Sequence, residues 1–445
     1  MAELDLGDQR LEKRAQRILK DFYADPGTAI PQACGSKAAA QAAYEFFDNW
    51  SVSSEAILAS HGRRALERMA AEPVLLAVQD TTSFNHSHHA QIKGMGPIGT
   101  EAKGPQGFFL HTTLALTPQR VPLGVIQAQM WARDPEQTGK SEARRQRPIE
   151  EKESYKWMES FQLAGTRIVN IGDREADVYE LFELADGLVG GPYLLIRAEQ
   201  DRCLAEPAGQ HLWSGMEQQP VSGHLRVALK PTPKRAARVA TLEVRWAQVP
   251  LKPPQGKGRP GRPALMVAAI LAQEVGAPRG VEPVCWMLLT NLVVDSSESA
   301  LEKVEWYCGR WEIEVFHGIL KGNCKVEERQ LETFERQQRC LTLDLLIAWQ
   351  IHFLVKQSRQ HPDLPASQVF SEDELQVLYL CVEKKPLPSG EPVSLQQATR
   401  LVAKLGGFLG RKGDGQPGPK TLGRGLRRLH DMTTGYRTAR AHSPP

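Results

Sequence analysis

Two short apolar runs, each followed by an aspartate, constrain the fold of this chain most. The first, PVLLAVQDTTSF at residues 73–84, predicts a buried strand that ends near Asp80. The second, within TRIVNIGDREADVYELFELA, predicts a strand that delivers Asp173 and is followed by a helix. Two strands therefore each present a carboxylate near their C-terminal end. Glu175 and Asp177 lie in the same segment as Asp173 and are alternative candidates for its role.

Helical patterns precede these strands and a hairpin lies between them. Residues 5–75 carry apolar side chains at helical spacing, and SSEAILASHGRRALERMA opens on serines that can cap a helix. FFLHTTLALTP (108–118) and VPLGVIQAQMWA (121–132) flank a turn that contains proline, which predicts an antiparallel hairpin. The charged stretch at 142–163 is expected to be helical.

The second half of the chain changes from a period of two back to helical spacing. Residues 190–293 alternate as strands do, around a basic loop, LKPPQGKGRPGRPA, that we expect to be mobile. A helical region resumes near residue 297, and TLDLLIAWQIHFLVKQ (342–357) is apolar nearly all round, which predicts a buried helix. A polar break at 358–366 separates a smaller helical region at the C-terminus.

Composition and charge narrow the class of protein. With 445 residues, 41% apolar and 24% charged, the chain suits a soluble protein of two or three domains. It has no apolar run of about 18 residues and no signal-peptide core, and its seven scattered cysteines fit reduced thiols, so a cytoplasmic location is expected. Lysine and arginine outnumber acids ten to one at 221–270 and nine to two at 401–445. Such blocks suit nucleic acid, or are solvated basic loops.

The segment YCGRWEIEVFHGILK (307–321) mixes charged and apolar residues. As one helix, it would place five polar side chains within an arc of roughly 80°; these are Tyr307, Arg310, Glu314, His317 and Lys321. The stripe is either a solvated face with an Arg310–Glu314 pair or a set of side chains directed at a ligand. Because charges on a mostly buried helix need partners, the narrow stripe favours the second interpretation.

Asp80, Asp173 and Glu314 together form a set of oxygen ligands suited to Mg²⁺ or Mn²⁺. Three carboxylates placed together would repel each other unless divalent cations compensated them. Two such ions can activate a water or a 3′-hydroxyl and stabilise the leaving oxygen when a phosphodiester is cleaved. His86, His88 and His89 offer a weaker alternative, a zinc site.

The spacing of a tyrosine, an arginine three residues on, a glutamate four further and a lysine seven further resembles the Y-R-E-K signature of bacterial insertion-sequence transposases. Other matching segments are QDTTSF, GDREADVYE, LGDQRLEKR with AAYEFFDN, and LGGFLGRKGDGQPGPKTLGRG near the C-terminus. The resemblance therefore covers nearly the whole chain.

The resemblance implies an α/β fold, with an Asp-Asp-Glu triad on a ribonuclease H-like core. Residues 1–70 would form a helical domain that binds the DNA end, and residues 71–365 the catalytic domain with a β-rich insertion at 190–293. Residues 366–445 would form a helical dimerisation domain. The 141 positions from Asp173 to Glu314 independently indicate a folded insertion, because a compact core does not need so long a gap.

The resemblance also implies roles for single residues. Asp80, Asp173 and Glu314 would be the catalytic, metal-binding carboxylates. DNA contacts would come from the phosphate-binding side chains Tyr307, Arg310 and Lys321, from Trp286 as the platform for a flipped base, from Arg197 and Arg202 in the insertion, and from Tyr44 in the N-terminal domain.

A cut-and-paste transposase is the function that the resemblance implies. Mg²⁺, replaceable by Mn²⁺, would support nicking, hairpin formation, hairpin opening and strand transfer. The partners would be the inverted repeats at the transposon ends, target DNA and a second copy of the chain, in the bacterial cytoplasm near the nucleoid and away from membranes.

Two alternatives stay open. One is a DNA-binding regulator without catalytic turnover, since the chain begins close to LGDQR, where relatives often carry a further helical segment. The other is a nuclease that only nicks.

Overall fold

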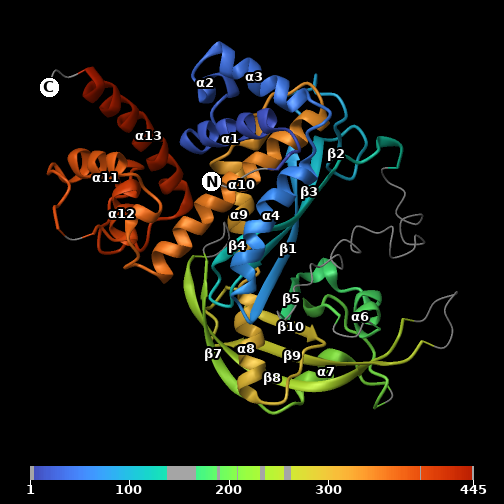
Figure 1. Ribbon diagram of the computed structural model, residues 1–445. Helices are drawn as coiled ribbons and strands as arrows, with labels where there is room; N and C mark the ends of the chain where they lie inside the picture. Colours follow the sequence, from blue (N-terminus) through green and yellow to red (C-terminus); the bar gives the residue numbers. More distant parts are fainter. Residues whose placement is uncertain are drawn as a thin grey trace.

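The computed structural model describes residues 5–137, 167–187, 191–207, 209–230, 236–254, 262–390 and 392–442 (Figure 1). The chain opens with the helices α1 (Gln9–Ala24), α2 (Ile30–Cys34), α3 (Lys37–Asp48) and α4 (Ser54–Ala70), as the apolar spacing predicts. Ser53 caps α4, because its hydroxyl accepts a hydrogen bond of 3.1 Å from the backbone N–H of Ala56. The helical character expected for residues 5–75 is therefore confirmed.

One mixed sheet crosses the middle of the molecule in the order β2-β3-β1-β5-β6-β10-β9-β8-β7, with β4 paired to β3. Its first strands are β1 (Val74–Asn85), β2 (Gly96–Pro97), β3 (Gln106–Leu116), β4 (Pro122–Trp131), β5 (Arg167–Gly172) and β6 (Tyr193–Arg197). Strands β3 and β4 form the predicted antiparallel hairpin, whereas β1, β5 and β6 run parallel. The helix expected at 142–163 lies outside the described residues.

The β-rich segment continues this sheet instead of forming a separate one. It contributes β7 (Gly223–Leu229), β8 (Arg238–Leu251), β9 (Leu265–Val275) and β10 (Cys285–Thr290). Strand β10 pairs antiparallel with β6, which joins the two halves of the sheet. Short helices cover this half: η4 (Arg174–Ala176), α6 (Tyr179–Asp186) and α7 (Leu212–Glu217). Residues 255–261 of the basic loop that we expected to be mobile lie outside the described residues.

The two faces of β1 pack against different helices. Leu75 and Ala77 share an apolar cluster with Ala65 of α4. Leu76 and Val78, which alternate with them, belong to the main core cluster together with Phe316. Side chains alternate between the two faces of a strand, so Asp80 projects to the same face as Val78. That face is the one that packs against α9 (Trp311–Gly322), the helix of Phe316.

The segment at 307–321 is not the single helix that its pattern predicts. Helix α8 (Ser297–Cys308) ends at Gly309, and α9 (Trp311–Gly322) begins after Arg310. The backbone N–H groups of Gly309 and Arg310 bond to Trp306 and Tyr307 in a tight turn. Tyr307 therefore belongs to a different helix from Glu314, and the predicted arc of polar residues applies only from Arg310 onward.

A long helix anchors the C-terminal part of the chain. Helix α10 (Phe334–Gln360) has buried residues on nearly every side between Cys340 and Val355, as predicted for 342–357. The short turn η5 (Val326–Glu328) precedes α10, and η6 (Ala366–Gln368), α11 (Glu372–Leu378), η7 (Tyr379–Glu383), α12 (Leu395–Leu405) and α13 (Pro419–His442) follow it. Another short turn, η1 (Pro135–Gln137), follows the hairpin of β3 and β4. A buried pair, Arg329 and Asp344 at 2.9 Å, ties η5 to α10.

The main apolar cluster includes residues from α1, the sheet and α12. The proposed division into domains at residues 70 and 365 stays a prediction. Within the described ranges, no helix combines the length and apolar character needed to cross a membrane.

His86 gives the fold a pH dependence that can be measured. It is buried, its ring stacks on Phe108 with the centroids 5.4 Å apart, and neither ring nitrogen has a hydrogen-bond partner in the described part of the chain. Burial, and secondly His89, lowers the pKa of His86 from 6.5 to about 4. Between these values the unfolded chain binds more protons, so the fold loses stability as the pH falls through this window.

We expect His86→Phe to remove up to about 3 kcal/mol of acid-dependent loss in the free energy of unfolding. Urea unfolding between pH 7 and pH 4.5 measures this loss, with the exposed His88 changed to Phe as the control. Equal pH dependence in wild type and His86→Phe would show that His86 does not carry the effect.

Candidate active site

The parallel pairing of β1 and β5 brings two predicted carboxylates together. Val78 pairs with Ile171, and continuing this register by two residues sets Asp80 beside Asp173. Neighbouring strands lie about 4.8 Å apart, so the two side chains are neighbours. Each carboxylate also holds the local backbone, since Thr81 N–H donates to Asp80 at 2.8 Å and Glu175 N–H donates to Asp173 at 2.9 Å.

Arg310 connects the third predicted carboxylate to this pair. It stands immediately before α9, where the turn at Gly309 aims its side chain toward β1. Its Nη2 donates to Glu314 Oε1 at 2.6 Å, and its Nη1 lies 3.7 Å from Asp80 Oδ2. The Arg310 side chain is 11% exposed, and its Nε and Nη1 have no hydrogen-bond partner among the described residues. Arg310 is thus a half-satisfied cation between carboxylates.

The electrostatics show that the three carboxylates, Asp80, Asp173 and Glu314, share one local field. Burial raises the pKa of Asp80 to about 6; Arg310 opposes the shift, and Asp173 and Glu314 add to it. Burial alone would lower the pKa of Arg310, but Tyr307 and the three carboxylates raise it. Among the described residues, the site therefore contains more negative charge than Arg310 compensates.

The chemistry of the three carboxylates suits a divalent cation, but their present positions do not. The donors are carboxylate oxygens, the ligands that Mg²⁺ prefers, and Asp173 and Glu314 are close enough to raise the pKa of Asp80. Among the described residues, however, no three His, Cys, Asp or Glu side chains converge closely enough to hold an ion. Glu314 accounts for part of this, because its carboxylate is 54% exposed and turned onto Arg310.

Asp177, the alternative candidate to Asp173, has a structural role. Its carboxylate is buried and accepts hydrogen bonds from the backbone of Glu199 and Gln200 and from Arg202 Nη2, the last at 2.7 Å. This arrangement favours Asp173, which is half-buried, over Asp177 as the acid of the site, while Glu175 is exposed. It also gives Arg202, which is 8% exposed, a structural role, and its predicted contact with DNA stays a prediction.

Trp286 and Tyr307 pack against each other at the border of the site. Their rings meet edge to face at 5.4 Å, and both side chains are buried. Burial raises the pKa of Tyr307, while Arg310 and Arg197 lower it. The contact with Trp286 links the Tyr307 ring to strand β10 of the sheet. The phosphate contact predicted for Tyr307 stays a prediction.

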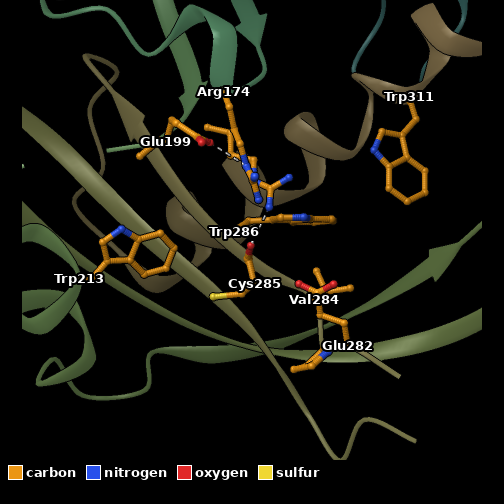
Figure 2. Close-up of a pocket in the computed structure, with 11 residues that line it drawn as sticks. Arg174, Glu199, Trp213, Glu282, Val284, Cys285, Trp286 and Trp311 are labelled. Carbon is orange, nitrogen blue, oxygen red and sulfur yellow. Dashed lines mark hydrogen bonds and ion pairs between the residues drawn. The ribbon is translucent and has the colours of Figure 1, made fainter. Parts of the chain in front are cut away.

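A cavity of about 490 Å³ opens beside Trp286. Figure 2 shows Trp213 and Trp311 on opposite sides of it, with Arg174 pointing toward Trp286. Arg197 also lines it and donates to the carbonyl oxygen of Cys285 at 3.1 Å. The cavity combines aromatic faces with arginine side chains, the pairing that suits a nucleobase and its phosphate.

The other predicted DNA contacts are spread over the molecule. Lys321 is exposed at the end of α9, with its Nζ 5.4 Å from the centre of the Phe84 ring. Tyr44 lies on α3 and lines a second cavity, of about 510 Å³, together with Lys325 and Arg329. Neither position is brought to the three carboxylates by a contact in the described chain, and both roles stay predictions.

Sequence reasoning missed four residues of this region. Arg174, Trp213 and Trp311 line the cavity, but no pattern in their segments singled them out. Glu312 is buried beside α10 and was left unassigned. An acid between apolar residues in a helix that is mostly buried is the signal that could have identified Glu312.

Removing the compensating cation should destabilise the protein when no divalent ion is present. Arg310→Met leaves the three carboxylates without a counter-charge, and we expect the free energy of unfolding in EDTA to fall by about 1–3 kcal/mol. Arg437→Met, which breaks an exposed pair with Asp373, is the matched control and should cost less than about 1 kcal/mol. Equal losses in the two variants would contradict this account of the site.

Two family models match the ends of the chain. The one described as "Transposase DNA-binding" matches residues 1–52, which contain α1 to α3. The one described as "Transposase Tn5 dimerisation domain" matches residues 346–444, from within α10 through α13. Together they support a transposase of the Tn5 type that binds DNA and forms a homodimer.

Proposed function

We propose that the chain is a cut-and-paste DNA transposase whose phosphoryl-transfer site is formed by Asp80, Asp173 and Glu314. Transposase function in general is supported by the two family matches. The observation that carries the finer proposal is the meeting of two strand carboxylates with the Arg310–Glu314 pair of α9. We further propose a ribonuclease H-like core, supported by the order β4-β3-β1-β5-β6, with an antiparallel hairpin beside parallel strands.

Mg²⁺, or Mn²⁺ in its place, is the proposed cofactor, held by the three carboxylates. When bound, such ions activate an attacking water or 3′-hydroxyl and stabilise the leaving oxygen. The protein's part is to supply Asp80 in its ionised form, which its pKa of about 6 allows at neutral pH. Glu314 also has to turn from Arg310 toward the two aspartates, and its exposure leaves room for this rotation.

Arg310 is freed by the same rotation. Once Glu314 turns away, the guanidinium of Arg310 has donors available for a phosphate oxygen, because Nη2 is released and Nε has no hydrogen-bond partner in the described chain. A planar guanidinium binds phosphate through two parallel hydrogen bonds. We therefore propose that DNA binding exchanges the Arg310–Glu314 pair for an Arg310–phosphate pair, and that Glu314 turns toward the two aspartates, with which it would hold the ion.

The cavity beside Trp286 is the proposed site of the flipped base. Its volume falls in the range of roughly 300–1,000 Å³ that is typical of small-molecule sites. Extruding a base costs a few kcal/mol, which stacking on an aromatic ring partly offsets. Nicking, hairpin formation, hairpin opening and strand transfer would then share one site, with the base held aside while the strand end is folded back.

A regulator without turnover is the second candidate, because Glu314 is paired with Arg310 and does not converge with the aspartates. Replacement of Glu314 distinguishes the two functions. The substrate is a short duplex that carries the element's inverted repeat, taken from the DNA that flanks the reading frame.

We expect Glu314→Gln to slow cleavage of this duplex in Mg²⁺ by at least about a hundredfold while DNA binding is retained. Gel-shift and single-turnover assays measure the two properties, and Glu298→Gln, an exposed acid of α8, is the control. Cleavage at the wild-type rate by Glu314→Gln would refute the triad. Binding by wild type without any cleavage would favour the regulator.

Trp286 should act after the first nick. Without its ring, the flipped base loses about 1–3 kcal/mol of stacking, so Trp286→Ala should nick normally but form hairpins roughly 10 to 100 times more slowly. Denaturing gels resolve the two products, and Trp286→Phe should recover part of the hairpin rate. Equal slowing of nicking and hairpin formation would exclude a specific role in base stacking.

A further inference from the structure

Glu312 is a buried acid on the first turn of α9. It lies two residues before Glu314, which corresponds to about 200° around a helix, so the two acids face in nearly opposite directions. The Glu312 side chain is 4% exposed, whereas that of Glu314 is 54% exposed. Glu314 faces the open site, and Glu312 faces the interior.

Three basic side chains from two other elements meet the Glu312 carboxylate. His352 Nε2 lies 2.9 Å from Oε2, and Lys356 Nζ lies 2.7 Å from Oε1; both belong to α10. Lys230 Nζ lies 3.7 Å from Oε1 and stands directly after β7, the last strand of the sheet. One carboxylate therefore joins α9 to α10 and to the β-rich insertion.

The ion pairs around Glu312 hold α9, α10 and the β-rich insertion in a fixed relative position. A buried carboxylate cannot move away from its cations without a large desolvation cost, so the three elements are held in one arrangement. Buried ion pairs add little net stability compared with apolar residues of the same size. The arrangement that is fixed here contains the first turn of α9, from which Arg310 and Glu314 project.

We propose that Glu312 is a positioning residue for the reaction described under the proposed function, on which this inference rests. Through Lys356 and His352 it fixes the first turn of α9, and hence Glu314, against the long buried helix. Through Lys230 it couples that turn to the insertion, which carries the cavity beside Trp286. DNA held by the insertion is thereby kept in register with the carboxylates that act on it.

Lys230→Met is the sharpest variant, because Lys230 is half-exposed and lies outside α9. The experiment compares wild type, Lys230→Met, Glu312→Gln and the double variant on the end duplex. Affinity is measured without divalent ions, and the cleavage rate is measured in Mg²⁺ at saturating DNA. Lys404→Met, which breaks the exposed pair with Glu383, is the matched control.

Displacements of about 1 Å at a reacting group can cost a hundredfold in rate. We expect Lys230→Met to cleave roughly tenfold more slowly with its affinity within about twofold of wild type. Glu312→Gln should be at least as slow as Lys230→Met. The double variant should be no slower than Glu312→Gln, because both changes break the same Lys230–Glu312 ion pair. Lys404→Met should match wild type in both measurements.

Three outcomes overturn the proposal. Lys230→Met could cleave at the wild-type rate, it could lose affinity while the rate at saturation is unchanged, or the two changes could multiply in the double variant. The second outcome would make Lys230 a DNA contact. If Glu312→Gln fails to fold, the comparison of Lys230→Met with Lys404→Met still tests the proposal.

Hydrogen exchange separates this inference from the proposed function. If wild type does not cleave, the transposase proposal fails, and amide exchange of residues 311–322 in DNA-free protein still tests the link. Faster exchange in Lys230→Met than in Lys404→Met supports a coupling from β7 to α9. Identical exchange in the two variants overturns it.

Discussion

The guanidinium of Arg310, held between carboxylates, is the interaction on which the rest of the site depends. Two aspartates come from parallel strands, and a glutamate comes from the helix that packs on their face. Three such charges repel each other unless a cation compensates them. In the protein alone, Arg310 supplies part of that charge through its contacts with Asp80 and Glu314. Among the described residues, this single guanidinium compensates the three carboxylates only in part, so the site suits further positive charge.

The break between α8 and α9 makes this arrangement possible. Across the turn at Gly309, Tyr307 packs on Trp286 while Arg310 reaches Asp80 of β1. The two side chains stay close enough for Arg310 to lower the pKa of Tyr307. The same turn exposes Glu314 on one side of α9 while Glu312 is locked into the interior on the other. Helix, sheet and insertion thus meet at the first turn of α9.

Much of this could be predicted from the sequence, for identifiable reasons. Apolar runs ending in acids predicted the strands of Asp80 and Asp173, and period-two alternation predicted the strands of the insertion. Three features could not be derived, because they depend on packing between distant segments. These are the junction of the insertion with the core through β6 and β10, the helix break at Gly309, and the burial of Glu312 against α10. A pattern within one segment carries no information about which partner its polar residues meet.

The central claim is that the three carboxylates form one divalent-cation site. Binding of Mn²⁺, followed by electron paramagnetic resonance of the free ion at pH 7.5, tests this claim without requiring catalysis. The account predicts saturable binding by wild type, with affinity at least about tenfold lower in the Asp80→Asn/Asp173→Asn double variant. Equal Mn²⁺ affinity in wild type and in the double variant would contradict it.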